Sequence, residues 1–510
     1  MLVQKAFLYS GTGRREYLLA HGQRHDSQFA VRTAAPFVSL SLSLSLQGSG
    51  QPAAMGSVAV PPCHVVAVPF PGRGHVNAML NLCRLLAARD GVSATVVVTE
   101  EWLGLLGGPA LAPGVRLEAV PNVIPSEHGR AADWAGFVDA VYNKMEAPFE
   151  RLLDRIGAAP AAIVTDTFVP GAVRVGNRRG VPVCILSALG ATMFSVHYRF
   201  DRLPTASGGS ADMTDVTDDP CLMENYIPGL KSIRLADLEP THSDKIRLDK
   251  ILEAYPYVRK AQCVIFTSFY ELESNAIDFL RQELPCPVFA VGPCIPFLAL
   301  QENQADSEEE KGYMTWLDTQ PASSVLYVSL GSFLSVSPAQ MDEIAIGLAQ
   351  SKVRFLWVLR DACGRVQGLA CGGGSDGVVV PWCDQLKVLC HPSIGGFITH
   401  CGMNSTLEAL YAGVPMLTLP IAFDQPINSR RIVDEWKVGY SLKEKARADG
   451  VIGREEIAET VKRLMDCGDG EGTRRRASLL KEASRAAVEV GGSSDRDMTS
   501  FINYISQFKN

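Results

Sequence analysis

The segment WCDQLKVLCHPSIGGFITHCGMNSTLEALYAGVPMLTLPIAFDQ, residues 382–425, carries the clearest indication of the fold class. An apolar run at 396–399 leads through a glycine-containing turn into the helix-forming run TLEALYA. Gly413 and Pro415 end that run, and a second apolar run follows at 416–419. A strand, a turn, a helix and a second strand are the parts of a βαβ unit, so the segment predicts a parallel sheet.

The same alternation of short apolar runs and longer helical segments extends through the chain from residue 63. A first series of expected strands covers 64–68, 94–98, 162–165, 183–186, 264–267 and 288–291. A second series covers 325–329, 355–359, 378–380, 396–399 and 416–419. Two series predict an α/β protein with two facing, doubly wound, Rossmann-like domains. Ligands of such sheets bind at the carboxyl ends of the strands, so we expect the function in an interdomain cleft.

The composition between these series suggests the domain boundaries. We expect a first domain over 57–295, a linker over 296–315 where five acids fall within ten positions, a second domain over 316–490, and a final segment over 491–510 with the spacing of an amphipathic helix. Exposed loops are expected at 205–219 and 371–377. In the helix predicted after residue 337, Ser337 suits the N-cap, Pro338 the first helical position, and Gln340 the partner of a capping box.

The first 56 residues form a separate leader, with five basic residues, two acidic residues and a Ser-Leu alternation at 39–46. Three interpretations stay open: a translated untranslated sequence with Met55 as the true start, an organelle transit peptide, and a structured segment. The leader has no periodicity that could bury a face. We therefore expect a protein that begins at Met55 to match the full chain in activity and stability.

Overall composition excludes several classes of protein. The 510 residues are 47% hydrophobic, and 48 basic against 55 acidic side chains give a net charge of −7 without a long block of one sign. This disfavours a nucleic-acid partner. Thirteen scattered cysteines lack disulfide or zinc-site spacing, which favours a reducing, cytoplasmic compartment and no metal. The apolar runs are too short for a membrane span. We expect a monomer.

The turn at 400–405 has the chemistry of an anion site. Gly402 lies where the strand passes into a helix N-terminus, whose unpaired N–H groups and positive dipole end attract phosphate oxygens. His400, Asn404 and Ser405 add side-chain donors there. Glu408, one helical turn further, can accept hydrogen bonds from the two hydroxyls of a ribose.

Both ends of the 382–425 segment and the first predicted turn add further groups. Trp382 offers a flat surface for a nucleobase. Asp424 and Gln425 can together accept from and donate to the hydroxyls of a sugar. In PFPGRGHVNAML, residues 69–80, His75 stands at the mouth of a helix after the first strand, and histidine is suited to accept a proton near neutral pH.

These residues resemble the signature box of the plant secondary-product glycosyltransferases, which use UDP-sugars, and the resemblance extends over about 63–505. It includes the initial Trp, Gln385 at the fourth position, H-x-G-x-N-S-x-x-E at 400–408 and the closing Asp-Gln pair. It implies a GT-B fold, an acceptor bound mainly by the first domain and a UDP-sugar bound mainly by the second. The implied donor-binding residues are Ser332, Trp382, Cys383, Gln385, His400, Gly402, Asn404, Ser405, Glu408, Asp424 and Gln425.

The resemblance also implies roles for these residues. Trp382 would stack on uracil, Gln385 and Glu408 would hold the ribose, and the final Asp-Gln pair would hold the sugar. The diphosphate would lie against the turn at 400–405 and against Ser332 in VLYVSLGSF, residues 325–333. Because a final Gln is typical of glucose users, glucose is the expected sugar.

In this family the histidine that matches His75 is the general base, and the aspartate that matches Asp166 orients it. The implied reaction is direct displacement with inversion onto a hydroxyl or carboxyl of a small plant metabolite. UDP-sugar is then a substrate, and no cofactor or metal is needed if the helix dipole, His400 and Ser332 stabilise the leaving UDP. The final helix would cross back onto the first domain.

Two positions depart from the family pattern, and two other functions are the alternatives. Met403 stands where many members have Trp, and Ala78 where Pro is frequent. An NAD-type oxidoreductase would need a G-x-G-x-x-G fingerprint, which this sequence lacks. A non-catalytic UDP-sugar-binding protein is the other alternative, and the presence of His75 and Asp166 argues against it.

Overall fold

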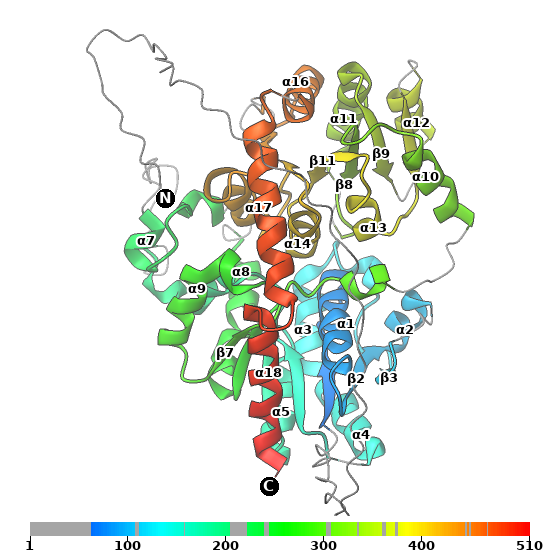
Figure 1. The fold of residues 1–510 in the computed structure, drawn as a ribbon. Helices are drawn as coiled ribbons and strands as arrows, with labels where there is room; N and C mark the ends of the chain where they lie inside the picture. Colours follow the sequence, from blue (N-terminus) through cyan, green and yellow to red (C-terminus); the bar gives the residue numbers. More distant parts are fainter. Residues whose placement is uncertain are drawn as a thin grey trace, which may run out of the picture. The chain divides into compact units, whose positions relative to one another are not determined.

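The computed structural model describes residues 63–107, 112–157, 159–204, 222–238, 244–301, 308–333, 336–359, 364–372, 376–443, 446–447, 450–466 and 468–509. The leader and the loop expected at 205–219 lie outside these residues. The described strands form two all-parallel sheets, with the orders β3-β2-β1-β4-β5-β6-β7 and β10-β9-β8-β11-β12-β13 (Figure 1). Both belong to one compact unit, 60–510. The predicted α/β class with two doubly wound sheets is confirmed.

The first sheet contains every strand of the first predicted series and one more. Its strands are β1 Cys63–Val68, β2 Val92–Thr99, β3 Val115–Val120, β4 Ala162–Asp166, β5 Val183–Ser187, β6 Cys263–Phe266 and β7 Val288–Ala290. The additional strand is β3, VRLEAV, which pairs only with β2 at the edge of the sheet. Its charged residues are tolerated at an edge, and they interrupt the apolar run by which the buried strands were recognised.

The second sheet likewise contains the predicted strands and one more. Its strands are β8 Val325–Ser329, β9 Arg354–Val358, β10 Gly377–Val380, β11 Ile394–Thr399, β12 Met416–Thr418 and β13 Gly439–Ser441. The missed strand, β13, is only three residues long and includes Gly and Ser, both weak strand formers. It pairs with β12 at the edge.

Helices cover both faces of each sheet. Those of the first domain are α1 Arg73–Ala87, α2 Glu100–Leu106, α3 Trp134–Lys144, α4 Glu146–Ile156, α5 Pro170–Arg179, α6 Ala191–Tyr198, α7 Leu222–Tyr226, α8 Lys245–Leu252 and α9 Tyr270–Glu283. In β1, Val66 and Val68 pack into the core under α3 to α6, whereas Val65 and Ala67 pack into the core under α1 and α2. A strand buried on both faces needs the continuous apolar sequence by which it was predicted.

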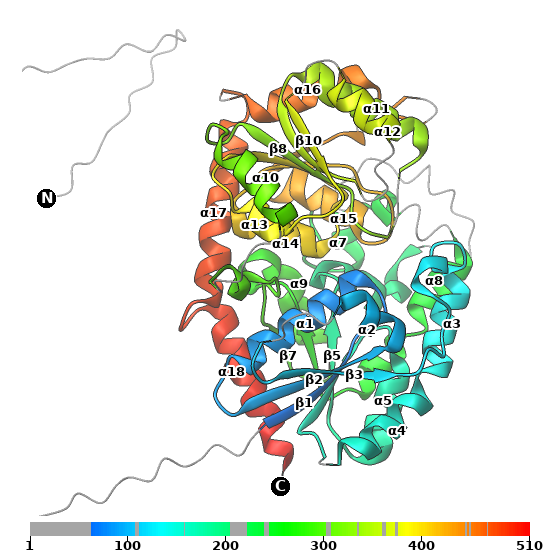
Figure 2. The same ribbon diagram turned by 90° about the vertical axis from the view of Figure 1, so that its right-hand side faces the viewer.

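The second domain is built in the same way (Figure 2). Its helices are α10 Glu308–Asp318, α11 Pro338–Ser351, α12 Gly364–Cys371, α13 Gln385–Leu389, α14 Met403–Ala412, α15 Gln425–Arg430, the π-helical turn η8 Arg431–Glu435, α16 Arg454–Met465 and α17 Glu471–Val488. Helices α13, α14 and α17 contribute to one core, and α11, α12 and α16 to the other.

The segment expected as the linker, 296–315, contains regular structure in its described residues. A 3-10 turn, η7, covers Phe297–Gln301, and α10 begins at Glu308. The acidic run therefore begins a helix there. In the loop expected at 371–377, Cys371 ends α12 and Gly377 begins β10.

Helix α11 shows one half of the predicted capping box. Ser337 is the N-cap, and its Oγ accepts a hydrogen bond from the backbone N–H of Gln340 at 3.2 Å. The Gln340 side chain does not return to Ser337. Instead it donates to the carbonyl of Ile452 at 3.1 Å and accepts from the Ile452 N–H at 2.9 Å. The predicted bond from the Gln340 side chain back to Ser337 is therefore wrong. The Gln340 amide instead satisfies the carbonyl and the N–H of Ile452, which would otherwise be buried without partners.

The last helix, α18 Ser493–Ser506, follows α17 and packs against β7 of the first sheet in both views (Figures 1 and 2). Met498, Phe501 and Ile505 join the core that covers β1 and α1. The Asp497 carboxylate accepts from the Ala290 N–H at 2.8 Å. The helix thus contacts the first domain at both apolar and polar points. No described helix has both the length and the apolar character needed to cross a membrane.

Candidate active site

A cleft of about 970 Å³ lies at the carboxyl ends of both sheets. Its walls are the segments that follow β1, β4 and β5 in the first domain and β8, β10, β11 and β12 in the second. The predicted site residues that line it are His75, Ser332, Trp382, Cys383, Gln385, His400, Gly402, Asn404, Ser405, Glu408, Asp424 and Gln425. Only Asp166 among the predicted residues lies behind the surface. The structure therefore brings the whole predicted set to one place.

His75 and Asp166 form a hydrogen-bonded pair at the first-domain wall. The His75 Nδ1 atom lies 2.7 Å from Asp166 Oδ2, and the carboxylate is 1% exposed. Its second oxygen accepts from the Phe168 backbone N–H at 2.9 Å. An ionised carboxylate can only accept, so Nδ1 carries the proton and Nε2 has the free lone pair. The ring centroids of Phe70 and Phe168 lie 5.1 and 6.0 Å from the centroid of the imidazole, and these rings hold it in place. The pair can accept a proton from a group in the cleft.

His400 occupies a narrow space between two glycines. A Cβ added at Gly331, whose φ is +82°, would lie 2.7 Å from His400 Nε2, and one at Gly402 would lie 2.5 Å from it. Any larger residue would displace the ring. Burial lowers the pKa of His400 to about 4, so the ring is neutral near pH 7. Its N–H can give a phosphate one hydrogen bond.

The N-terminus of α14 faces the cleft, as predicted. Gly402 is its N-cap and provides no side-chain acceptor for the first-turn N–H groups. Asn404 has a contact that the sequence did not predict: its Nδ2 donates to the carbonyl of Gly74 in the first domain at 2.7 Å. The amide therefore connects the two walls. Met403, the departure from the usual Trp, is buried in the core beneath the helix.

Glu408 and Gln385 lie side by side further along the same wall. Gln385 Nε2 donates to Glu408 Oε2 and to Ser405 Oγ, the second bond at 3.0 Å. Burial raises the pKa of Glu408 to about 7, and the bond from Gln385 only partly opposes this. The carboxylate is thus poised for partners that donate hydrogen bonds. The nearby Trp382 ring is 59% exposed, which is unusual for this side chain and leaves a flat apolar surface open.

Cys383 differs from the other predicted donor-site residues. Its Sγ lies 3.3 Å from the Tyr327 hydroxyl, and the side chain is buried. Burial raises the pKa of this thiol to about 12, so it remains protonated. The side chain thus packs beneath the wall, and contact with a ligand at this position falls to the backbone.

Asp424 and Gln425 stand at the start of α15, both buried. Gln425 Oε1 accepts from the N–H groups of Ile421 and Ala422 at 2.7 and 3.0 Å, which leaves the amide NH₂ as its group for a ligand. Asp424 Oδ2 accepts from Asn428 at 2.7 Å, and burial raises the pKa of Asp424 to about 6. Phe423, just before them, has a φ of +61°, an uncommon value for a bulky residue that is typical of functional sites.

The acceptor side of the cleft is largely apolar and was mostly missed by the sequence analysis. It includes Phe70, Trp134, Val138, Phe168, Leu189, Met193, His197, Ile251 and Phe423. The rings of Trp134 and Phe423, one from each domain, are 5.8 Å apart. A second cross-cleft contact places the Arg130 guanidinium 3.8 Å from the Phe333 ring. Such residues look like ordinary core in the sequence, because only the fold turns them toward the cleft.

Comparison with known proteins gives this geometry its context. A family described as UDP-glucoronosyl and UDP-glucosyl transferase matches residues 278–465. UDP-glycosyltransferase 87A2 of Arabidopsis thaliana is 46% identical over 450 residues, which cover 87% of this chain and 97% of that protein. Indole-3-acetate beta-glucosyltransferase of Zea mays is 32% identical and covers 87% of this chain and 98% of that protein.

Solved structures agree with these relatives. Medicago truncatula UGT71G1, complexed with UDP-glucose, has a TM-score of 0.75 at 27% identity and covers 87% of this chain and 98% of that one. Phytolacca americana UGT2, complexed with UDP-2-fluoro-glucose and pterostilbene, has a TM-score of 0.74 at 27% identity and covers 87% and 100%. The chain therefore belongs to the plant family 1 UDP-glycosyltransferases, enzymes that move a sugar from a UDP-sugar to an acceptor.

Proposed function

We propose that this enzyme transfers glucose, with inversion, from UDP-glucose to a hydroxyl or carboxyl group on a small acceptor with an apolar, ring-sized body. The observation that carries the proposal is the His75–Asp166 pair, at 2.7 Å, in the same cleft as Asp424 and Gln425. A base on one wall and a polar pair suited to a hexose on the other are the two parts that a direct displacement needs.

In the proposed reaction, uracil stacks on Trp382 and the ribose hydroxyls donate to Glu408. The diphosphate binds the N-terminus of α14, with hydrogen bonds from Ser405, His400 and Ser332. His75 Nε2 removes the acceptor proton, the acceptor oxygen attacks the anomeric carbon, and the bond from that carbon to the UDP oxygen breaks. Asp166 stabilises the imidazolium that forms.

We propose that no metal takes part. The support is the α14 N-terminus, whose dipole and first-turn N–H groups are oriented before the diphosphate arrives. Activity that is unchanged by EDTA would agree with this. A loss that added Mg²⁺ reverses would contradict it.

Glucose as the sugar is supported by Gln425 at the end of the signature segment and by the glucosyltransferase name of the maize relative. The buried Gln425 oxygen is held by two backbone N–H groups, so its NH₂ is fixed in direction. Gln425→His should shift the ratio of UDP-glucose to UDP-galactose use and leave UDP affinity nearly unchanged. An unchanged ratio would mean that this residue does not contact the hexose.

The acceptor class is supported by the wall that includes Phe70, Trp134, Phe168 and Phe423, since aromatic side chains prefer flat apolar partners. Mass spectrometry of products from a panel of phenols, terpenols and aromatic acids, each offered with UDP-glucose and UDP-galactose, tests acceptor and sugar together. We expect glucosides of the ring-bearing acceptors. UDP binding without any glycoside or hydrolysis would favour the alternative of a non-catalytic UDP-sugar-binding protein.

A further inference from the structure

Away from the cleft lining, a buried ion pair joins the two domains. Arg431, the first residue of η8 in the second domain, lies with its Nη1 2.5 Å from Oε1 of Glu273 in the first turn of α9. Both side chains are almost completely buried, at 2% and 0% exposure. A buried pair of this kind is costly to break, because either partner alone would be an uncompensated charge.

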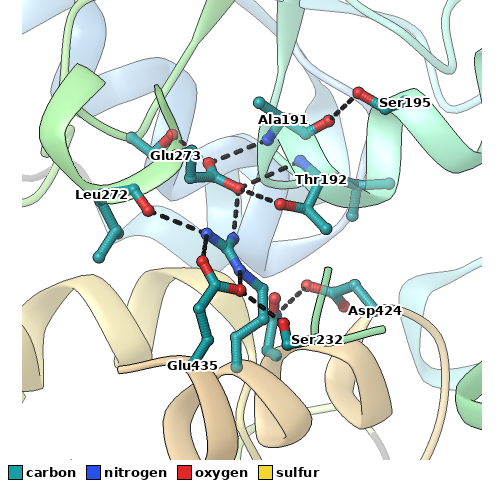
Figure 3. Close-up of polar contacts among 12 residues, drawn as sticks. Ala191, Thr192, Ser195, Ser232, Leu272, Glu273, Asp424 and Glu435 are labelled. Atoms are coloured by element: carbon teal, nitrogen blue, oxygen red, sulfur yellow. Dashed lines mark hydrogen bonds and ion pairs between the residues drawn. The ribbon is translucent and has the colours of Figure 1, made fainter. Parts of the chain in front are cut away.

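Glu273 also holds the start of α6, the helix of the acceptor wall (Figure 3). Its carboxylate accepts from the N–H groups of Ala191 and Thr192 at 2.9 and 3.1 Å, and from the Thr192 hydroxyl at 3.0 Å. Gly190, the N-cap of α6, has no side chain that could do this. Glu273 therefore supplies from another helix the acceptor that an N-cap residue usually supplies. Met193 and His197 of α6 line the cleft.

Arg431 holds the helix that begins at the sugar-binding pair. It directly follows α15, whose first residue is Gln425 and whose N-cap is Asp424. Its Nη2 donates to the Leu272 carbonyl of the first domain at 2.9 Å, and its Nε donates to Glu435 at 3.1 Å. Ile427, halfway along α15, is buried in the core of the first domain. Helix α15 thus has one end at the proposed sugar subsite and the other next to Arg431, which pairs with Glu273.

We propose that Glu273 and Arg431 are positioning residues that fix α6 of the acceptor wall against α15 of the sugar subsite, and so decide whether the sugar reaches the acceptor or water. The inference rests on the proposed assignment of Asp424 and Gln425 to the sugar. The Glu273 carboxylate contacts α6 directly and, through Arg431, the turn that directly follows α15, so neither helix can shift without breaking bonds inside a buried network. In transfer reactions a misplacement of about 1 Å can cost about 10²-fold in rate.

The competing reaction is hydrolysis of the donor. A water oxygen forms the new bond to the anomeric carbon, the bond from that carbon to UDP breaks, and His75 takes a proton from the water, giving free hexose and UDP. Water is small enough to reach the anomeric carbon from several directions. A loosened α6 should therefore slow transfer more than hydrolysis, and the ratio of hydrolysis to transfer becomes the diagnostic measurement.

The mildest test is Gly190→Ala. The φ of Gly190 is −61°, which alanine adopts without strain, but its Cβ would lie 2.8 Å from Glu273 Oε1. The substitution displaces the carboxylate without removing a charge. We expect the transfer kcat to fall by about 10-fold, the hydrolysis-to-transfer ratio to rise, and the UDP Kd to stay unchanged. The matched control is Gly104→Ala in α2, where an added Cβ meets no atom within 4 Å.

The stronger test compares neighbouring arginines. Arg431→Met should lower the transfer kcat by about 10²-fold and raise the hydrolysis ratio, with partial recovery in Arg431→Lys. Arg430 also bridges the domains, at 3.0 Å from Asp237, but it is more exposed, so Arg430→Met should change kcat by no more than about 3-fold.

The outcomes separate the possibilities. If Gly190→Ala and Arg431→Lys lower only the melting temperature, with kcat per folded enzyme and the hydrolysis ratio unchanged, the pair is merely structural and the inference is overturned. If Arg431→Met does not fold, Gly190→Ala decides alone. Failure of the sugar assignment would be seen separately, as an unchanged sugar preference in Gln425→His.

Discussion

The two walls of the cleft are built in different ways. The donor wall takes every predicted donor residue except Ser332 from one continuous segment, 382–425, and residues between Tyr327 and Val366 complete it. Burial tunes its groups: Glu408, Asp424 and His400 all have shifted pKa values. The acceptor wall is collected from positions between Phe70 and Ile251, with Phe423 from the second domain, and is mainly apolar. A nucleotide can be bound by local backbone geometry, whereas a variable acceptor is recognised by side chains on separate elements. Substitutions in the donor wall and in the acceptor wall should therefore have different effects.

The largest effect should come from the one acceptor-wall residue that performs chemistry. His75→Ala should lower kcat toward a phenol or alcohol by about 10² to 10⁴, the usual contribution of a general base. UDP affinity, measured by calorimetry, should hardly change, because the proposed nucleotide contacts lie on the other wall. Full activity of this variant toward an alcohol at neutral pH would remove the general base from the mechanism.

Two comparisons serve as controls for this prediction. Asp166→Asn should cause a smaller loss in the same direction, since it removes the charge that stabilises the imidazolium. A carboxylic acid acceptor is already ionised at pH 7 and needs no base. The His75→Ala defect should therefore be much weaker with acids than with phenols.

The next effect concerns the donor wall. Glu408→Ala should weaken UDP binding by about 1 to 3 kcal/mol, which is about 5- to 150-fold in Kd, because a carboxylate that accepts hydrogen bonds is lost. Binding of UDP-glucose should weaken equally, since the contact is to the ribose. Calorimetry with both ligands measures this. Unchanged UDP affinity would make Glu408 a structural residue of α14.

The raised pKa of Glu408 predicts how nucleoside binding depends on pH. Ribose hydroxyls donate best to the carboxylate, so binding favours the ionised form and releases a proton. Affinity should therefore rise with pH through about 7, by up to about 10-fold between pH 6 and pH 8. Uridine is the right ligand because it has no phosphate to titrate in this range. The slope should vanish in Glu408→Gln, and a slope that persists there belongs to another group.

The smallest effect should be seen in the apolar part of the acceptor wall. Trp134 faces the cleft, and its ring lies 5.8 Å from the Phe423 ring in a tilted arrangement. Trp134→Ala should raise the acceptor KM by about 2- to 10-fold, as expected for the loss of an aromatic contact, with the UDP Kd unchanged. A change in UDP affinity would show that the two walls are less independent than their construction suggests.

The contrast between the walls also explains what could be predicted from the sequence. The buried strands were predicted because strands covered on both faces need continuous apolar sequence. Strands β3 and β13 escaped because charged residues interrupt β3, and β13 is only three residues long and includes Gly and Ser. The donor-wall residues were found because their spacing lies within one βαβ unit. Phe168, Met193 and Phe423 could not be distinguished from core residues, since only long-range packing brings them to the cleft.

The hydrogen-bond partners of two side chains could not be predicted from the sequence either. The side chains of Gln340 and Asn404 bond to the backbones of Ile452 and Gly74, which are distant in sequence. Local rules suggested a capping box for the first and a phosphate contact for the second. Which peptide groups are left without partners is known only once the chain is folded.

The position of α18 has a consequence for how the protein is made. Met498, Phe501 and Ile505 complete a core that also contains Val65 and Val76, near the start of the first domain. Ribosomes deliver the chain from its amino end, and domains generally fold as units in that order. Here the first domain to emerge lacks part of its core until the whole second domain has been translated. Its final packing is therefore post-translational, and a message truncated before α18 would yield a first domain with an uncovered apolar face.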